Sequence, residues 1–298
     1  MTSPRHHLEA TALKGARALL VRLPERVARA VGSGIGWCVG TILGVRRATV
    51  RRNLELAFPD RSAAWRRGVA RRAWMHLGRE AVAALRLSAE TPEAIRARSE
   101  YEGEWTAFDR RVAEGKGVVV VTGHIGSWEI AGAAVAARGH AVDAVAVRQR
   151  NPLVDRELAE SRRRLGMQVI PRHEAPRRIL AALRAGRVAG IVGDQNVAFG
   201  GIFVDFMGHA ASTARGAAVF ALRTGAPLFA GVALALPGAE WRYRVIVHEV
   251  DVERSGDFET DVHRLTQAHT HALERVVRDH PEQYFWLHRR WKRREIGS

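Results

Sequence analysis

The stretch GVVVVTGHIGSWE, residues 117–129, decides the fold of this chain. Its first half is an uninterrupted apolar run, which predicts a strand over residues 118–121 that is buried on both faces. Gly123 and Gly126 follow, and glycines permit the sharp bend that a turn needs. We expect a helix from Trp128 to Ala137, so the stretch predicts a strand, a turn and a helix in succession.

The same alternation of strand and helix continues to the C-terminus. The expected strands span residues 141–147, 168–170, 188–192, 227–234 and 241–247, and the expected helices span 104–114, 151–165, 176–183, 213–223 and 260–279. Such alternation is typical of an α/β domain with three layers, in which helices flank a mainly parallel sheet. We assign residues 53–298 to this domain, and we expect Ser62 to cap a helix that reaches about Leu87.

Residues 1–52 form an N-terminal segment in this interpretation. Residues 8–23 place apolar and basic side chains at helical spacing, which predicts an amphipathic helix ended by Pro24. The sixteen residues from Ala30 to Val45 carry no charge, and arginines flank them. They are fewer than the roughly 20 apolar residues of a spanning helix, and a buried core helix would share their composition. The flanking arginines favour a membrane-associated helical segment.

The composition indicates an anionic partner. The chain has 298 residues, a net charge of +16 and three lysines among 47 basic residues, so arginine dominates. Arginine binds phosphates and carboxylates through two parallel hydrogen bonds, which favours a nucleic acid, an anionic membrane or a phosphorylated substrate. The chain lacks the motifs of the common nucleic-acid-binding folds, so no nucleic acid is expected. Its single cysteine, Cys38, excludes an internal disulfide and fits a reducing compartment.

His124 and Glu129 are the first candidates for chemistry. Five positions on one regular helix are about 140° apart, so their side chains would diverge there. They meet only if His124 lies on the turn and Glu129 on the first helical turn. A histidine oriented by a carboxylate is a general base, although a histidine at a turn can also be purely structural. Ser127 lies between them, and we interpret it as a helix cap.

Polar residues also follow other predicted strands, and sites in open α/β sheets gather at the carboxyl ends of strands. Several of these residues have a plain structural alternative: a solvated turn charge, a turn cap or a helix cap. In the run 162–164, three arginines form one solvated helix face from which one can reach a site. The candidates are Arg148, Asn151, Arg162, Arg163, Arg164, Asp194, Gln195 and Thr213.

Several reaction classes lack their motifs. The chain has no His-Glu-x-x-His zinc motif and no Gly-x-Ser-x-Gly nucleophile elbow. It has no phosphate-binding P-loop and no Gly-x-Gly-x-x-Gly dinucleotide motif. We therefore predict neither a metal nor a bound cofactor.

The ordered set of motifs resembles a known family. The His-x4-Glu pattern is similar to the signature of the glycerolipid acyltransferases. More specifically, the chain resembles the bacterial lipid A biosynthesis (lauroyl/myristoyl) acyltransferases, a family that includes phosphatidylinositol mannoside acyltransferases. The resemblance covers about residues 15–294 and rests on the segments 53–59, 123–129, 148–152, 194–195, 204–213, 224–227 and 281–290. Met207 departs from the pattern, because a second aromatic residue often follows Phe206.

The resemblance implies a glycerolipid acyltransferase-like fold and an O-acyltransferase at the cytoplasmic face of the bacterial inner membrane. The enzyme would move a fatty acyl chain from acyl carrier protein or coenzyme A to a hydroxyl of a lipid A precursor or related glycolipid. His124 would be the base and Glu129 its orienting partner, with Asp194 and one arginine of residues 162–164 completing the site. The partners would be the thioester, a phosphorylated glycolipid and an anionic membrane surface, and the enzyme would be a monomer.

Two other classes of function stay open at this point. One is a non-catalytic protein that binds anionic lipid or nucleic acid through its arginines. The other is a hydrolase of the same fold, which would release the acyl chain to water.

Overall fold

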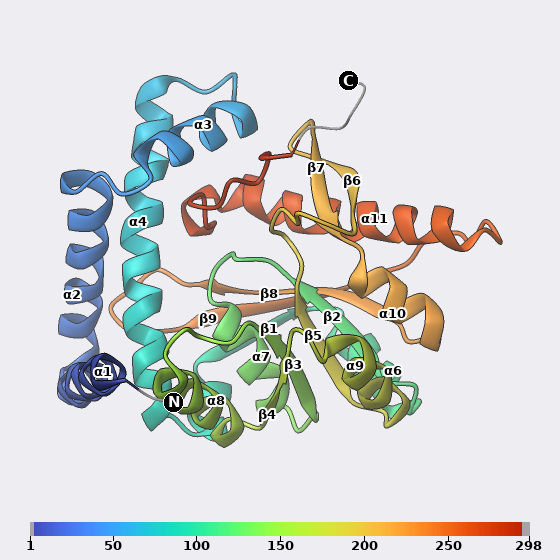
Figure 1. Ribbon diagram of the computed structural model, residues 1–298, viewed down its shortest axis with the longest axis horizontal. Helices are drawn as coiled ribbons and strands as arrows, with labels where there is room; N and C mark the ends of the chain where they lie inside the picture. The colour runs from blue at the N-terminus through green and yellow to red at the C-terminus, as the bar shows by residue number, and fades with distance from the viewer. Residues whose placement is uncertain (1–2, 294–298) are drawn as a thin grey trace.

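The computed structural model describes residues 3–293 and contains one large sheet (Figure 1). Its strand order is β1-β9-β8-β2-β5-β3-β4. The strands are β1 (Ser99–Gly103), β2 (Val118–Thr122), β3 (Val142–Ala146), β4 (Met167–Pro171), β5 (Val188–Val192), β8 (Leu228–Ala235) and β9 (Tyr243–Val250). Strands β8 to β4 are parallel, β9 is antiparallel to β8, and β1 is parallel to β9. The prediction of a mainly parallel α/β sheet is confirmed.

Helices cover both faces of the sheet, which explains the uninterrupted valines of β2. Val118 and Val120 belong to a core with α5 (Pro92–Ala97), α6 (Trp105–Ala113), α7 (Trp128–Ala137) and the end of α8 (Pro152–Arg164). Val119 and Val121 belong to a core with α9 (Ala175–Arg184), α10 (Gly216–Thr224) and α11 (Phe258–Asp279). A strand packed on both sides needs apolar residues at every position.

A two-stranded hairpin was not predicted. Strands β6 (Gly201–Phe206) and β7 (His209–Ala214) pair antiparallel, and Met207 and Gly208 form the turn with positive φ values of 58° and 77°. Two such residues suit the twist of a tight hairpin. The helix predicted over residues 213–223 is present as α10, but its predicted start is wrong, because Thr213 lies in β7 and α10 begins at Gly216.

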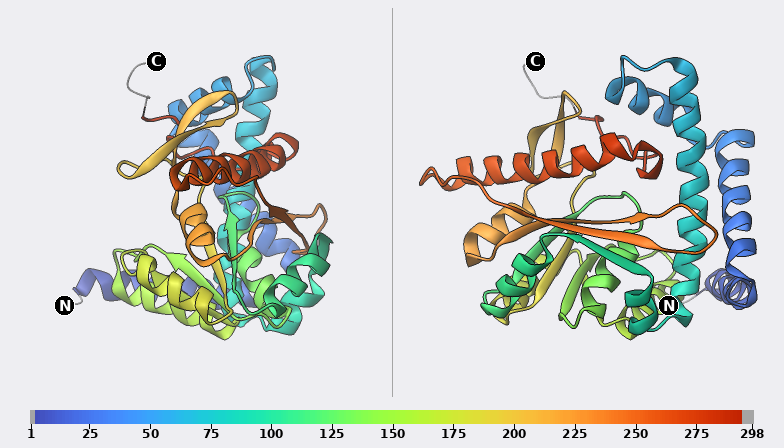
Figure 2. Two further views of the ribbon diagram at one scale, coloured as in Figure 1. Left: turned by 90° about the vertical axis from the view of Figure 1, so that its right-hand side faces the viewer. Right: turned by 180° about the vertical axis from the view of Figure 1, so that it is seen from behind.

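The N-terminal residues form helices that stand beside the sheet (Figures 1 and 2). They are α1 (Pro4–Arg22), α2 (Glu25–Trp37), a π-helical turn η1 (Cys38–Ile42), α3 (Arg47–Ala57) and α4 (Ala63–Arg86). Elsewhere in the described chain, two short 3₁₀ turns follow α4 and α11, respectively: η2 (Leu87–Ala89) and η3 (Pro281–Gln283). Ser62 caps α4, as predicted: its side chain accepts a hydrogen bond from the Trp65 N–H. No single described helix is long and apolar enough to cross a membrane, although Glu25–Ile42 and Arg47–Ala57, bent by 92°, together meet the length and composition required.

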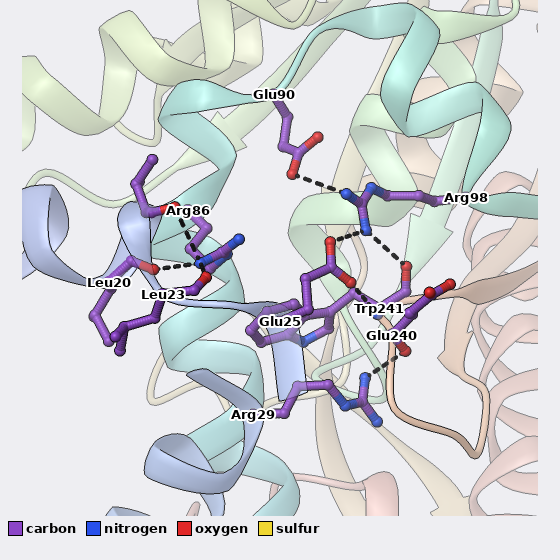
Figure 3. Close-up of polar contacts among 10 residues, drawn as sticks. Leu20, Leu23, Glu25, Arg29, Arg86, Glu90, Arg98, Glu240 and Trp241 are labelled. Carbon is purple, nitrogen blue, oxygen red and sulfur yellow. Dashed lines mark hydrogen bonds and ion pairs between the residues drawn. The ribbon is translucent and has the colours of Figure 1, made fainter. Parts of the chain in front are cut away.

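Polar contacts join α1 and α2 to the rest of the chain (Figure 3). Arg86 of α4 donates to the carbonyls of Leu20 and Leu23 at the end of α1. Glu25 of α2 pairs with Arg98 at 2.5 Å and accepts from the Trp241 backbone N–H at 3.1 Å. Because Arg86 donates to carbonyls at the last turn of α1 and at its C-cap, it fixes the junction of α1 and α2.

Glycines bring α2 against α4. A Cβ atom on Gly36 would lie 2.0 Å from the Trp74 carbonyl oxygen, and one on Gly78 would lie 2.1 Å from the Gly32 carbonyl oxygen. Such distances leave no room for a side chain, so the two backbones are in direct contact.

We expect Gly36→Ala to destabilise the protein by about 1–3 kcal/mol, because the new methyl group must push α2 away from α4. Gly34→Ala is the matched control, because no atom lies within 4 Å of its added Cβ. That change should instead stabilise the helix by roughly 0.5–1 kcal/mol. Urea unfolding of both variants measures the difference, and equal free energies of unfolding would contradict the close contact.

Candidate active site

His124 lies on the turn between β2 and α7, and residues 283–285 hold this turn in place. The Phe285 N–H donates to the His124 carbonyl at 2.9 Å, and the Gly126 N–H donates to the Gln283 carbonyl at 3.0 Å. Gly126 has a φ of +58°, and a Cβ there would lie 2.0 Å from the Ala233 carbonyl oxygen. Only glycine fits this conformation and contact, so Gly126 fixes the path of the turn.

Asp194, two residues after the end of β5, holds His124 through two hydrogen bonds. Its Oδ1 lies 2.7 Å from Nδ1 of the imidazole, and its Oδ2 accepts from the His124 backbone N–H at 2.9 Å. A Cβ on Gly123 would lie 3.3 Å from the Asp194 side chain, so the glycine leaves room for this approach. The side-chain amide of Gln195 lies 3.3 Å from Nε2 of His124. Both predicted candidates after β5 therefore lie against His124.

The charge of Asp194 sets the tautomer of His124. Burial by itself would raise the pKa of Asp194, but the charge of His124, its two hydrogen bonds and the charge of Arg290 together hold that pKa below its usual value. An ionised carboxylate only accepts hydrogen bonds. In neutral His124 the proton is therefore on Nδ1, and the lone pair is on Nε2, where a base needs it.

Glu129 does not orient His124, which corrects the predicted pairing. Its two oxygens accept from Nε and Nη2 of Arg162 at 2.9 and 2.5 Å. The hydrogen bonds that Arg162 donates to Glu129 raise the pKa of Arg162. Nδ1 of His124 bonds to Asp194 instead, so the carboxylate that holds the imidazole in this structure is Asp194, and Glu129 holds Arg162.

The structure also selects one arginine from the run 162–164. Arg162 is the one that reaches Glu129, from α8. Arg163 pairs with Glu160 at 2.5 Å on the exposed face of the helix, and Arg164 is exposed. Within residues 3–293, neither of these two forms a hydrogen bond or ion pair with the residues around His124.

Arg148 and Asn151 are not gathered around His124. The Arg148 side chain is 65% exposed and lies 3.9 Å from Glu174. Asn151 caps α8, because its Oδ1 accepts from the Leu153 N–H at 3.0 Å, and its amide nitrogen donates to Glu9 of α1 at 3.0 Å. Asn151 therefore has the structural role of joining two helices.

Thr213 supports a buried arginine that the sequence reasoning missed. Arg290 donates to Oγ1 of Thr213 at 2.5 Å and to the Ser212 carbonyl at 2.7 Å, and its guanidinium lies 5.2 Å from the centre of the Phe206 ring. Its charge helps to keep Asp194 ionised. Arg290 follows no strand, so the rule about strand ends could not find it; its only signal was the motif at residues 281–290.

Two buried groups of α4 lie beneath the turn and were also missed. The Nε2 atom of His76 lies 3.2 Å from the Gly126 carbonyl oxygen, and burial lowers the pKa of His76 to about 4. Glu80 accepts from the Tyr243 hydroxyl at 3.1 Å, and burial raises the pKa of Glu80. The spacing of four residues places both on one face of α4.

An apolar cavity of about 90 Å³ begins beside the site, between α7 and the sheet. Most of its lining is aliphatic, and its charged members are Glu129 and Arg162. Trp128 lines the cavity and also lies with its ring centre 5.1 Å from that of His124. The cavity and the imidazole are therefore neighbours.

One group of potential metal ligands occurs among the described residues. The ligand atoms of Asp205, His271 and Glu274 lie within 4.8 Å of one another. Glu274 already bonds to the Met207 N–H at 2.7 Å and to Arg278 at 2.6 Å. These residues are outside the His124 site, and the expectation of a metal-free reaction stays a prediction.

The chain is similar to known acyltransferases along almost its whole length. A family model described as bacterial lipid A biosynthesis acyltransferase matches residues 5–293. The lipid A biosynthesis palmitoleoyltransferase of Escherichia coli K12 is 28% identical over 282 residues, which are 94% of this chain and 90% of the relative. The phosphatidylinositol mannoside acyltransferase of Mycolicibacterium smegmatis is 30% identical over 191 residues, 63% of this chain and 59% of the relative. The chain therefore belongs to the bacterial lipid A biosynthesis acyltransferase family and is an O-acyltransferase.

Proposed function

We propose that this enzyme transfers a fatty acyl chain from an acyl thioester to a hydroxyl of a lipid A precursor or related glycolipid. The observation that carries the proposal is the His124–Asp194 pair, which leaves Nε2 as a base beside an apolar cavity. The relatives named for lipid A and phosphatidylinositol mannoside acylation support the glycolipid acceptor. The donor is acyl carrier protein or coenzyme A carrying the chain, and no cofactor is bound.

In the proposed reaction, Nε2 of His124 removes the proton of the acceptor hydroxyl as its oxygen attacks the thioester carbonyl. The C–S bond of the tetrahedral intermediate then breaks, and the leaving thiolate takes the proton from Nε2. Asp194 stabilises the imidazolium that exists between these two steps. Positioned base catalysis of this kind contributes about 10²–10⁴-fold to the rate. The amide of Gln195, now 3.3 Å from Nε2, lies where the acceptor hydroxyl must enter.

Arg162 is our candidate for stabilising the oxyanion of the intermediate. The Gly126 and Ser127 N–H groups are already engaged with the carbonyls of Gln283 and Ala233. Glu129 occupies Nε and Nη2 of Arg162, and Nη1 has no partner within residues 3–293. Glu129 would thus hold a guanidinium in place with one nitrogen free to donate.

The apolar cavity is the proposed site of the acyl chain. Its volume equals about three waters in the liquid, which is less than a long chain needs, so the walls must open. Met167 packs against Gly132, since a Cβ atom added to that glycine would lie 2.7 Å from the Met167 sulfur. A methionine side chain is flexible and unbranched, so Met167 is the wall residue most able to move.

The proposed attachment to the cytoplasmic face of the inner membrane uses the N-terminal helices. Val27, Val31 and Ile35 recur every four residues on α2 and are exposed, which gives one apolar stripe along the helix. Arginines flank this region in the sequence and suit anionic headgroups. We propose that a monomer binds the membrane through this stripe.

Mass spectrometry of the lipid product tests the function. Purified protein, an acyl-carrier-protein thioester and a phosphorylated lipid A precursor should yield the precursor with one additional acyl chain. Free fatty acid with an unchanged precursor would instead assign the hydrolase activity. Neither product, together with salt-dependent binding to DNA, would assign a binding protein.

A further inference from the structure

A second concave surface lies between α3 and residues 288–292. It consists of a groove of about 810 Å³ that adjoins a hollow of about 420 Å³, with Arg289 and Lys292 shared by both. Its α3 wall carries Arg46, Arg47 and Arg52, and its other wall carries His288. We call the surface formed by these six residues the basic groove.

The basic groove carries a concentrated positive charge. Its lining contains five permanent cations and no carboxylate. The side chains of Arg52, Arg289 and Lys292 have no hydrogen-bond or ion-pair partner in the described part of the chain, and all three are exposed. Like charges held together repel one another, and an anion with several acceptor oxygens relieves this repulsion. The groove therefore fits a phosphate group.

The two walls of the basic groove are fixed relative to each other. Asn53 of α3 is buried, and its amide nitrogen donates to the carbonyls of Trp286 and His288 at 2.8 and 2.6 Å. Arg46 adds a bond to the Leu287 carbonyl at 3.1 Å. The cations are thus carried on a preformed surface.

The basic groove also adjoins the active site. Nε2 of His288 accepts from the Asn196 N–H at 3.0 Å, and Asn196 follows Asp194 and Gln195, which contact His124. His288 therefore joins the groove to the loop that carries Asp194 and Gln195, the two residues that contact His124. A ligand whose phosphate lies in the groove can extend past His288 toward His124.

The rim of the groove is apolar. Ile42 and Leu43 are 60% and 67% exposed, and Val45 is also exposed. These residues directly precede Arg46 and Arg47. A cationic groove beside exposed aliphatic residues suits an amphiphile, with its phosphate in the groove and its chains on the rim, better than a water-soluble anion.

We propose that the basic groove binds the phosphate of the acceptor glycolipid and presents its sugar hydroxyl to His124. The identification of the ligand as the acceptor rests on the proposed function. The binding of a phosphorylated glycolipid does not rest on it, and a binding measurement without turnover tests it separately.

The experiment compares R289Q/K292Q with R177Q/R184Q. The second pair removes the same charge from exposed positions of α9, at the opposite end of the molecule from α3 (Figure 1). Binding is measured by sedimentation with phosphatidylcholine vesicles that contain a phosphorylated lipid A disaccharide, before and after its phosphates are removed enzymatically. The parent and the α9 variant should bind the phosphorylated vesicles at least about tenfold more tightly than the dephosphorylated ones. The groove variant should lose this preference, and R289K/K292R should retain it.

Two further arms identify the source of the phosphate. Phosphatidylglycerol vesicles without glycolipid should bind the parent and the groove variant nearly equally. Acyl carrier protein without its acyl chain should also bind the two proteins with equal affinity. A groove-dependent preference for either would overturn the assignment to the acceptor. Retention of the full preference for phosphorylated glycolipid by R289Q/K292Q would overturn the site itself. With an active preparation, the groove variant should raise the acceptor KM about tenfold and leave the donor KM unchanged.

Discussion

Replacing Asp194 by asparagine is expected to lower kcat for acyl transfer by about 10²–10⁴-fold, the range associated with a positioned base. An asparagine can donate its amide hydrogen to Nδ1, which moves the imidazole proton to Nε2 and removes the lone pair that accepts the hydroxyl proton. His124→Ala should have a similar effect for the simpler reason that the base is absent. Steady-state kinetics at saturating donor and acceptor measure both variants.

The double variant tests whether the two residues act as one unit. His124→Ala/Asp194→Asn should be no slower than the worse single variant, because residues that act through each other are not additive. Glu129→Gln should couple in this way with Arg162→Gln and not with His124→Ala. Strong coupling of Glu129 to His124, with Asp194→Asn near parental activity, would restore the pairing that the sequence first suggested.

Acid should destabilise the protein between pH 6.5 and 4, because His76 and His269 are buried in their neutral form. Burial lowers the pKa of each to about 4. Between that value and the ordinary pKa of about 6.5, the unfolded chain binds more protons than the folded one, so stability is lost as the pH falls through this window. At pH 5 the loss relative to pH 7.5 should be roughly 2 kcal/mol for each histidine.

His269→Leu isolates one of these contributions without removing a hydrogen bond, because neither ring nitrogen of His269 has a partner among the described residues. Urea unfolding at pH 7.5 and pH 5 should show a smaller acid loss in this variant than in the parent. His173→Gln is the control, since that imidazole is exposed. Glu80 opposes the histidines because its pKa is raised, so the difference between variant and parent is the readout. An unchanged difference in His269→Leu would contradict the assignment.

The sequence predicted the elements whose pattern is local. The valines of β2, the Ser62 cap and the long helix α11 follow from side-chain periodicity and capping, which neighbouring residues determine. β1 escaped detection because it is a largely exposed edge strand with the sequence SEYEG. Ser212 and Thr213 look like helix caps, but their hydroxyls bond to Val197 and Arg290 instead.

The candidate site was predicted as a set of residues and not as a set of pairs. Asp194 faces His124 because β5 lies beside β2, and this strand order leaves no local trace in the sequence. Glu129 is closer to His124 along the chain, but the first turn of α7 directs it toward α8. Arg162 differs from its two neighbours only in the face of the helix that it occupies, which depends on where α8 packs.

The contact between α2 and α4 determines how far His124 lies from the exposed face of α2. α4 contacts α2 through bare backbone at Gly78, and its residue His76 contacts the turn that carries His124. With the apolar stripe of α2 at the bilayer surface, as proposed, this thin spacing fixes the height of the base above the lipid. A bulkier residue at the contact would increase this height or tilt α4 relative to the bilayer. Either change would alter which hydroxyl of a membrane-embedded acceptor comes within reach of His124.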